Sequence, residues 1–296
     1  MNFRDCYELA QDIYPREKYR TFRKRLSFAV RLFFHYRPTI KALDAFFAET
    51  PLRDFIFSQP GFKENICIQQ ARSSFYRTSK REERLAFLLS HTRFLENTHQ
   101  EETIKGIYSR SLPPIVMQEG EHTLLFKLSY ENVISREGLL LLSVEMDGTV
   151  LYKITFWLME YIGVYTLCVG ALQGGKDTLE TNRLFTKEFW GLRPQNMAMM
   201  ALRWYAKSLG VEQILTFPRQ ALWSRKISRQ TALDDFWQEQ GAISVAKTPF
   251  IKLDSHIPHK DISEIATRKR SMYKKRYEFL DRLEPVLTSN FKRYLK

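Results

Sequence analysis

The chain has 296 residues, of which 44% are hydrophobic, and it contains 22 Phe, 14 Tyr and 5 Trp. This content excludes a disordered chain and is enough for a substantial core in one or two domains. No stretch approaches the roughly 20 apolar residues of a membrane-spanning helix, and the N-terminus lacks the apolar centre of a signal peptide, so we expect a cytoplasmic protein.

The net charge of +13 is concentrated at the two ends of the chain. Residues 1–37 hold nine Lys/Arg and four Asp/Glu, residues 268–296 hold ten and three, and the residues between them contribute only +1. Basic ends of this kind bind polyanions, so the partner classes are an anionic membrane surface, an acidic partner or nucleic acid. No recognised nucleic-acid-binding motif accompanies the charge, and nucleic acid is therefore not the expected partner.

Residues 1–110 are predicted to form a helical region. In Tyr19–Tyr36 the apolar residues recur at three- and four-residue steps while Lys and Arg fill the other faces, which predicts a basic amphipathic helix. Such a helix can lie on an anionic membrane, or it can pack its apolar stripe on the core as an ordinary surface helix. We expect it to end at Arg37-Pro38, and we expect further helices at Lys41–Phe47 and Lys80–Leu95.

Residues 111–260 are predicted to form an α/β core that begins with an antiparallel meander. Strands are expected at His122–Tyr130, Gly138–Val144, Val150–Leu158 and Tyr161–Gly170, with a late strand at Pro249–Leu253. Asp147-Gly148 joins the second and third of these strands and is the strongest short signal for a hairpin.

A crossover unit follows the meander. The apolar run Val164–Ala171 predicts a buried strand that is closed by a turn at Gln173-Gly174-Gly175, and Val211–Phe217 predicts a second strand. Between them, Gln195–Leu209 predicts a mostly buried helix with a narrow polar stripe of Asn196, Arg203 and Lys207. Strand, loop, helix and strand in this order place two parallel strands side by side.

The predicted fold class is therefore α/β (α+β), with a mixed β-sheet and a buried crossover helix. The helical region of residues 1–110 precedes this core of residues 111–260. Residues 261–296 form a basic C-terminal segment in which cations alternate with Tyr and Leu at helical steps.

The loop of the crossover unit is a candidate anion site. Gly191 to Pro194 opens directly into the helix, where free N–H groups and the helix dipole attract negative charge. The Arg193 guanidinium can bind a phosphate through two hydrogen bonds, and Lys176, Arg183 and Lys187 lie on the same connection. The alternative is that Gly191 and Pro194 are ordinary helix punctuation and that the cations are solvated.

The histidines, Cys168 and Glu137 are weaker candidates for a metal or catalytic site. The six histidines form neither HExxH nor a zinc spacing with Cys, so no metal is expected. Cys168 lies in the middle of a predicted strand, where a thiol is usually a small buried hydrophobe. Glu137 precedes a strand and is a candidate general base, although Arg136 and Gly138 also make it a plain turn residue.

Four stretches, GALQGG, TKEFWGLRPQNMAMMAL, DDFWQEQGA and ISEIATRKRSMYKKRYEFLDRL, together resemble the VirK/YbjX family of Gram-negative bacteria. The likeness runs in register from about residue 20 to the C-terminus. One departure follows the strand that ends at Phe217, where the family has an Asn and a His-containing segment and this chain has Pro218 to Trp223.

The resemblance implies a cytoplasmic or inner-membrane-associated protein with a role in envelope integrity, virulence and resistance to cationic antimicrobial peptides. The crossover core also looks like the acyl-CoA cradle of GNAT-type N-acyltransferases, in which a strand end and a helix N-terminus hold the pyrophosphate. On this basis acyl-CoA or an acyl-carrier protein would bind at Gln173, Gly174, Lys187, Gly191 and Arg193.

Two functional hypotheses follow. In the first, Glu137 is the catalytic base that activates an amine or hydroxyl on a cell-envelope precursor for acyl transfer. In the second, the protein is a non-catalytic module that binds envelope components or partner proteins through its basic ends.

Overall fold

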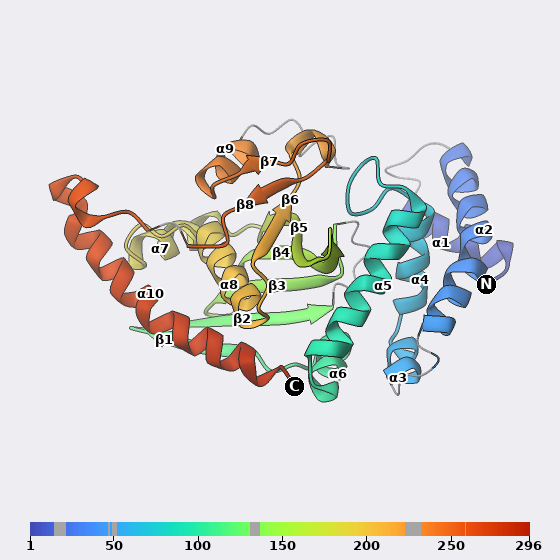
Figure 1. Ribbon diagram of the computed structural model, residues 1–296, viewed down its shortest axis with the longest axis horizontal. Coiled ribbons are helices and arrows are strands. Elements are labelled where there is room, and N and C mark those ends of the chain that lie inside the picture. Colours follow the sequence, from blue (N-terminus) through green and yellow to red (C-terminus); the bar gives the residue numbers. More distant parts are fainter. Residues whose placement is uncertain (15–21, 47, 49–51, 131–136, 223–231, 258) are drawn as a thin grey trace.

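The computed structural model describes residues 1–14, 22–46, 48, 52–130, 137–222, 232–257 and 259–296. Six helices lead into the sheet (Figure 1): α1 (Phe3–Ile13), α2 (Phe22–Phe46), α3 (Leu52–Ser58), α4 (Phe62–Ala71), α5 (Arg81–Thr98) and α6 (Glu101–Ser109). Four more lie later in the chain: α7 (Leu179–Glu188), α8 (Pro194–Ser208), α9 (Ala232–Glu239) and α10 (Thr267–Arg293).

The strands form one mixed sheet in the order β1-β2-β3-β4-β5-β6-β8-β7. Their bounds are β1 Ile115–Glu119, β2 His122–Tyr130, β3 Leu140–Met146, β4 Thr149–Tyr161, β5 Val164–Gly174, β6 Gln213–Thr216, β7 Ile243–Ser244 and β8 Ile251–Leu253. Strands β5 and β6 run parallel and the other neighbours run antiparallel. The predicted mixed sheet, helical N-terminal region and C-terminal helix are confirmed.

Two short hairpins set the register of the meander. Asp147 and Gly148 have φ of 50° and 78°, the left-handed pair that a two-residue hairpin turn requires. Ile162 and Gly163 repeat this geometry between β4 and β5, with φ of 53° and 73°. The Asp-Gly prediction is therefore confirmed, whereas the Ile-Gly turn carries a β-branched residue in a conformation that such residues rarely adopt.

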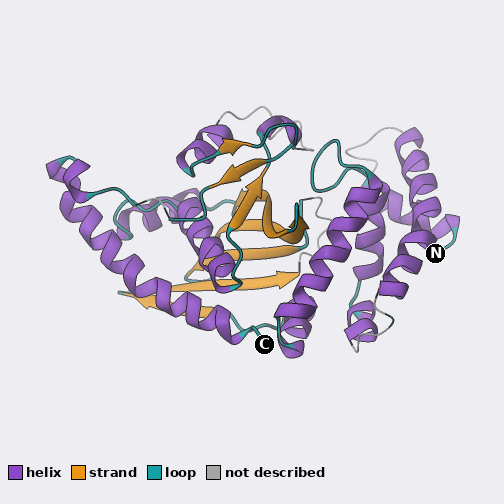
Figure 2. Ribbon diagram, viewed as in Figure 1, coloured by secondary structure: helices purple, strands orange, loops and turns teal. Residues whose placement is uncertain are grey.

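Helices cover both faces of the sheet (Figure 2). Neighbouring residues of a strand point to opposite faces. On β4, Phe156 contacts Tyr205 of α8, while Trp157 contacts Phe75 and the Phe87 ring of α5. Helices α8 and α5 therefore lie on opposite faces, and the core fills both spaces between helix and sheet.

The crossover unit is present as predicted, with one correction. Strand β5, helix α8 and strand β6 follow one another, Pro194 is the first residue of α8, and Gly210 takes the left-handed conformation after it with φ of 68°. The connection between β5 and α8 was predicted to be a loop, and this was wrong, because the connection contains α7. The buried side chain of Phe185 anchors this helix and stacks on Phe189 at 4.4 Å.

Helix α2 corrects the expected break at Arg37-Pro38. The helix continues through Pro38 to Phe46 and so includes most of the separate helix expected at 41–47. Leu32, Thr39 and Leu43 are all buried on one side of α2, so packing compensates for the hydrogen bond that Pro38 cannot donate. Residues 19–21 of the predicted amphipathic helix lie outside the described residues.

The outer N-terminal helices have a small core of their own. Cys6 and Ala10 of α1 pack with Phe28 and Leu32 of α2 and with Cys67 of α4. Helices α5 and α6 in turn pack on β4 and β2, so the helical region is joined to the sheet. None of the described helices combines the length and the apolar character that crossing a membrane requires.

Two buried histidines join α5 to its surroundings. His91 Nδ1 accepts a hydrogen bond from the Leu158 N–H of β4 at 3.2 Å. His99 Nε2 lies 2.9 Å from the Tyr205 hydroxyl of α8, and its Nδ1 lies 2.7 Å from Thr98 Oγ1. Burial lowers the pKa of His91 to about 3 and that of His99 to about 4, so both side chains are neutral in the folded protein at pH 7.

These histidines predict a loss of stability in acid. Between pH 6.5 and 4 the unfolded chain protonates both histidines and the folded chain does not, so the free energy of unfolding falls as pH falls. The expected loss at pH 4 is on the order of 3 kcal/mol for each histidine. Urea unfolding of the parent protein, His99→Gln and the exposed control His256→Gln at several pH values measures it. A His99→Gln curve as steep as the parent's would contradict the assignment.

Candidate functional site

The candidate site lies at the carboxyl end of the parallel pair β5 and β6. Regular pairing joins Thr166–Cys168 to Gln213–Leu215 and then stops, although β5 continues to Gly174. The last link is a hydrogen bond of 3.0 Å from Thr216 Oγ1 to the Val169 carbonyl. Helix α8 begins at this end. In open α/β sheets, ligands bind outside the carboxyl ends of the strands.

Glu137 reaches this end of β5 from the face that carries α5. A Cβ on Gly170 would lie 1.5 Å from the Glu137 carbonyl oxygen and 3.1 Å from the Trp157 ring, so only glycine fits here. A Cβ on Gly138 would lie 2.9 Å from the Phe156 backbone, at the bulge of β4 between Thr155 and Phe156. Glu137 itself is 6% exposed. The structure therefore places this carboxylate residue beside the point where β5 leaves β6.

Gln173 and Gly174 lie in strand β5 rather than in a turn. They pair with Lys153 and Tyr152 of β4. A Cβ on Gly174 would lie 3.6 Å from the Tyr152 ring, which is ordinary contact. Burial raises the pKa of the Tyr152 hydroxyl and the positive charge of Arg193 opposes that rise, so Arg193 lies near the same ring.

Lys187 and Gly191 take other positions. Lys187 is exposed on α7, with its Nζ 3.6 Å from the carboxylate of Glu188. Gly191 has φ of 75° and lies under α10, where a Cβ would meet the Arg276 guanidinium at 2.8 Å. Its N–H donates to the Thr186 carbonyl, and the Leu192 N–H donates to the Phe189 carbonyl. These two N–H groups are therefore engaged within the turn itself.

Arg193 precedes α8 and has a partner that sequence reasoning missed. Its Nη2 forms an ion pair with the Glu239 carboxylate at the end of α9. The next residue, Gln240, directs its amide at Asn196 Oδ1 at 3.5 Å. A phosphate at Arg193 must therefore compete with one carboxylate.

The polar stripe of α8 runs from Asn196 through the buried Arg203 to the exposed Lys207. Arg203 donates to the Gln240 side-chain and backbone oxygens at 2.7 and 3.3 Å and to the Asp254 carbonyl at 2.9 Å. Lys207 Nζ lies 2.7 Å from the Glu284 carboxylate of α10. Polar spacing along α8 predicts the stripe. Its partners, however, lie just after α9, just after β8 and on α10, and no local pattern identifies them.

A cavity of about 730 Å³ lies at the other end of the parallel pair. Its lining includes Val164 and Gln213, which begin β5 and β6, together with Arg203, Lys207 and Lys252. This is the amino end of the strands, so the cavity and the predicted anion site are separate places. In the described part of the chain no three His, Cys, Asp or Glu side chains gather in a way that could hold a metal ion.

The packing of Glu137 on β5 predicts that alanine substitution destabilises the protein at one glycine of this strand and not at another. Gly170→Ala forces the Glu137 backbone away and is expected to lower the free energy of unfolding by roughly 3 kcal/mol. Gly174→Ala meets only ordinary contacts and is expected to change it by less than about 0.5 kcal/mol. Urea unfolding of both variants tests this, and equal stabilities would show that Glu137 does not lie against Gly170.

Comparison with known proteins assigns the chain to a family. "Uncharacterized protein YbjX" of Escherichia coli is 30% identical over 184 residues, 59% of this chain and only half of that protein's length. An "Uncharacterized protein" of Haemophilus influenzae is 24% identical over 288 residues, 92% of this chain and 93% of its own. Among solved structures, a cAMP-binding acyltransferase from Mycobacterium smegmatis matches 66% of this chain and 60% of its own at 13% identity. The TM-score of 0.28 is too low for this match to indicate a shared fold or function. The family model described as "Protein of unknown function (DUF535)" matches residues 17–288, so the resemblance to YbjX is confirmed and the chain belongs to this family.

Proposed function

We propose that the protein is an acyltransferase-like enzyme that binds an acyl thioester at the carboxyl end of β5 and β6. The thioester is acyl-CoA or an acyl-carrier protein, and the acceptor is an amine or hydroxyl of a cell-envelope precursor. The observation that carries the proposal is the buried Glu137 beside Gly170, where strand pairing stops next to the start of α8. The envelope acceptor and a role in virulence and peptide resistance come from the family resemblance.

In this proposal the start of α8 binds the cofactor's phosphates, and Glu137 acts as the general base. At the start of α8 the helix dipole and the Arg193 guanidinium attract the cofactor's phosphates, which displace Glu239 from Arg193. The thioester then lies between the separated strands. Glu137 accepts the proton of the acceptor as the acceptor's nitrogen or oxygen attacks the thioester carbonyl. The carbon–sulfur bond then breaks, and the leaving thiolate takes this proton from Glu137.

Arg193→Ala tests the phosphate contact. It is expected to weaken CoA binding by about tenfold or more, since a charge-assisted bidentate contact contributes more than 1.4 kcal/mol. Stability should change by less than about 1 kcal/mol, because the ion pair with Glu239 is half exposed. Calorimetric titration with CoA measures both variants, with Lys252→Ala at the separate cavity as the control. If Arg193→Ala binds CoA as tightly as the parent protein, Arg193 does not bind the phosphates. If Lys252→Ala binds CoA more weakly, the ligand binds in the cavity instead.

Glu137→Gln tests the base. Thiol release from acyl-CoA, measured with a panel of amine and hydroxyl acceptors, is expected to fall by about 10²–10⁴ while CoA affinity stays within about twofold. Glu145→Gln is the matched control, because Glu145 is also a buried carboxylate of the sheet but lies in β3, away from the β5–β6 end. If Glu137→Gln releases thiol as fast as the parent protein, Glu137 is not the general base. Absence of release with every donor and acceptor would favour a non-catalytic binding protein.

A further inference from the structure

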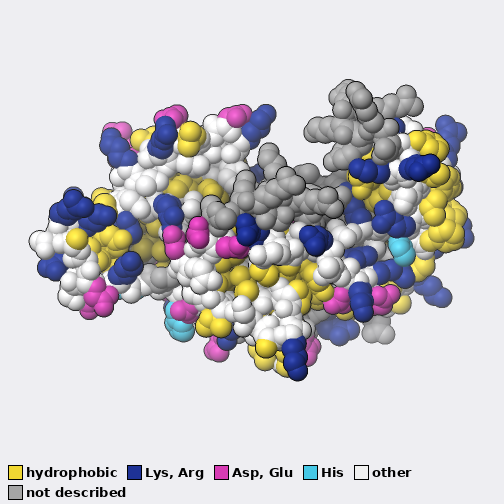
Figure 3. Space-filling view, turned by 90° about the horizontal axis from the view of Figure 1, so that it is seen from above, with side chains coloured by type: hydrophobic (Ala, Val, Ile, Leu, Met, Phe, Trp, Pro, Cys, Tyr) yellow, Lys and Arg dark blue, Asp and Glu magenta, His cyan; other side chains and the backbone are white. Residues whose placement is uncertain are grey.

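Exposed apolar side chains gather on the outer N-terminal helices. Of the twelve large hydrophobic residues that are exposed in the described part of the chain, five lie on α1 and α2. Phe22 and Phe34 are 62% and 67% exposed, and Phe3 is 41% exposed. Figure 3 shows yellow side chains beside dark blue ones over this end of the molecule. Exposure of several phenylalanines in one place is costly unless a partner covers them.

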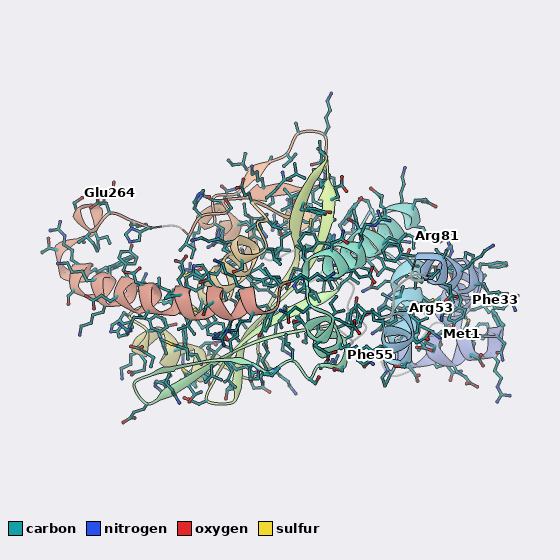
Figure 4. All side chains as sticks on the ribbon, turned by 60° about the horizontal axis from the view of Figure 1, so that its bottom comes forward. Met1, Phe33, Arg53, Phe55, Arg81 and Glu264 are labelled. Atoms are coloured by element: carbon teal, nitrogen blue, oxygen red, sulfur yellow. The ribbon has the colours of Figure 1, made fainter. Side chains whose placement is uncertain are left out.

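These side chains form one strip across two helices. Phe22, Leu26 and Val30 follow one another at four-residue steps along α2, and Phe33 and Phe34 extend the line. The Phe3 ring of α1 meets Phe33 edge to face at 6.0 Å, and Tyr7 meets Phe22 at 6.1 Å. In Figure 4 the labelled Phe33 and Met1 lie at the far end of the molecule from Glu264. We call the seven residues Phe3, Tyr7, Phe22, Leu26, Val30, Phe33 and Phe34 the aromatic strip.

The strip lies among cations. Helix α2 carries six Lys or Arg and one acidic residue. Arg23, Arg31 and Arg37 are exposed, and no carboxylate among the described residues forms an ion pair with any of them. The acidic residues of α1, Asp5, Glu8 and Asp12, follow a helical stripe separate from Phe3 and Tyr7, and Glu8 pairs with Arg4 at 3.0 Å.

The other basic end differs in its aromatic residues. In the N-terminal half of α10 the Tyr273 ring lies under the Arg276 guanidinium at 4.2 Å. Tyr277 stacks on His259 at 3.9 Å, and its hydroxyl bonds the backbone of Lys260. None of the exposed large hydrophobics in the described residues lies on α10. This end therefore offers charge alone, whereas the α1–α2 end offers charge and exposed aromatic rings together.

We propose that the aromatic strip docks on the surface of an anionic phospholipid bilayer. Aromatic and branched apolar side chains enter the headgroup boundary, while Arg23, Arg31 and Arg37 bind lipid phosphates beside them. Charge complementarity selects an anionic over a neutral surface, and the rings make the contact partly insensitive to salt. Docking does not depend on the acyl-transfer proposal, because no strip residue belongs to that site.

Co-sedimentation of the full chain with phosphatidylglycerol/phosphatidylcholine vesicles tests the docking. We expect binding at low salt that weakens as salt rises, and little binding to pure phosphatidylcholine. Phe22→Ala with Phe34→Ala, and separately Arg23→Gln with Arg31→Gln, should each weaken binding by about tenfold without loss of folding. Lys269→Gln with Lys274→Gln removes the same charge from α10 and should leave binding within about twofold.

Several outcomes would overturn the proposal. The parent protein could stay in the supernatant at low salt, bind neutral vesicles equally well, or lose as much affinity in the α10 control as in the strip variants. Analytical ultracentrifugation tests the alternative that a second copy of the chain covers the strip. A dimer that Phe22→Ala with Phe34→Ala dissociates, in a protein that does not bind vesicles, would assign the strip to a second copy of the chain.

Discussion

The buried guanidinium of Arg203 determines how the last strands join the sheet. Arg203 is 2% exposed in the middle of α8, and its donors bond to Gln240 and to the Asp254 carbonyl. Burial lowers its pKa to about 10, because a charge away from water is costly. Only a segment that brings these oxygens together compensates for that cost. The chain from α9 to β8 is therefore held against α8, and the pairing of β8 with β6 follows.

The same contacts hold the start of α8, the proposed phosphate site, in place. Gln240 joins Arg203 to Asn196, and the preceding Glu239 pairs with Arg193. The first turn of the helix is thus held in place with its local charge balanced. A phosphate carries more negative charge than one carboxylate and has the geometry for two hydrogen bonds to arginine, so it can replace Glu239 where a weaker anion cannot.

The sequence pattern correctly predicted those features that depend on residues close together in the chain. Strand β2 matches its predicted bounds, the Asp147-Gly148 hairpin is present, and α8 begins at Pro194. Pattern failed where tertiary packing overrides propensity, as at Pro38, where buried Thr39 and Leu43 keep the helix continuous. It also could not show that Gly170 gives room to Glu137, or that Gly191 lies beneath Arg276, because these pairs are far apart in sequence. The roles proposed for the candidate site residues stay predictions.

If both proposals hold, the position of the aromatic strip relative to the proposed acyl-transfer site limits which molecule can supply the acyl group. The aromatic strip lies on α1 and α2, α2 packs on α4, α4 on α5, and α5 on β4 (Figure 1). Helices α4 and α5 thus stand between the strip and the sheet whose β5–β6 end holds Glu137. A lipid acyl chain that stays in the docked bilayer does not reach through them. The donor must therefore come from solution, which favours acyl-CoA or an acyl-carrier protein over a membrane phospholipid as the acyl source.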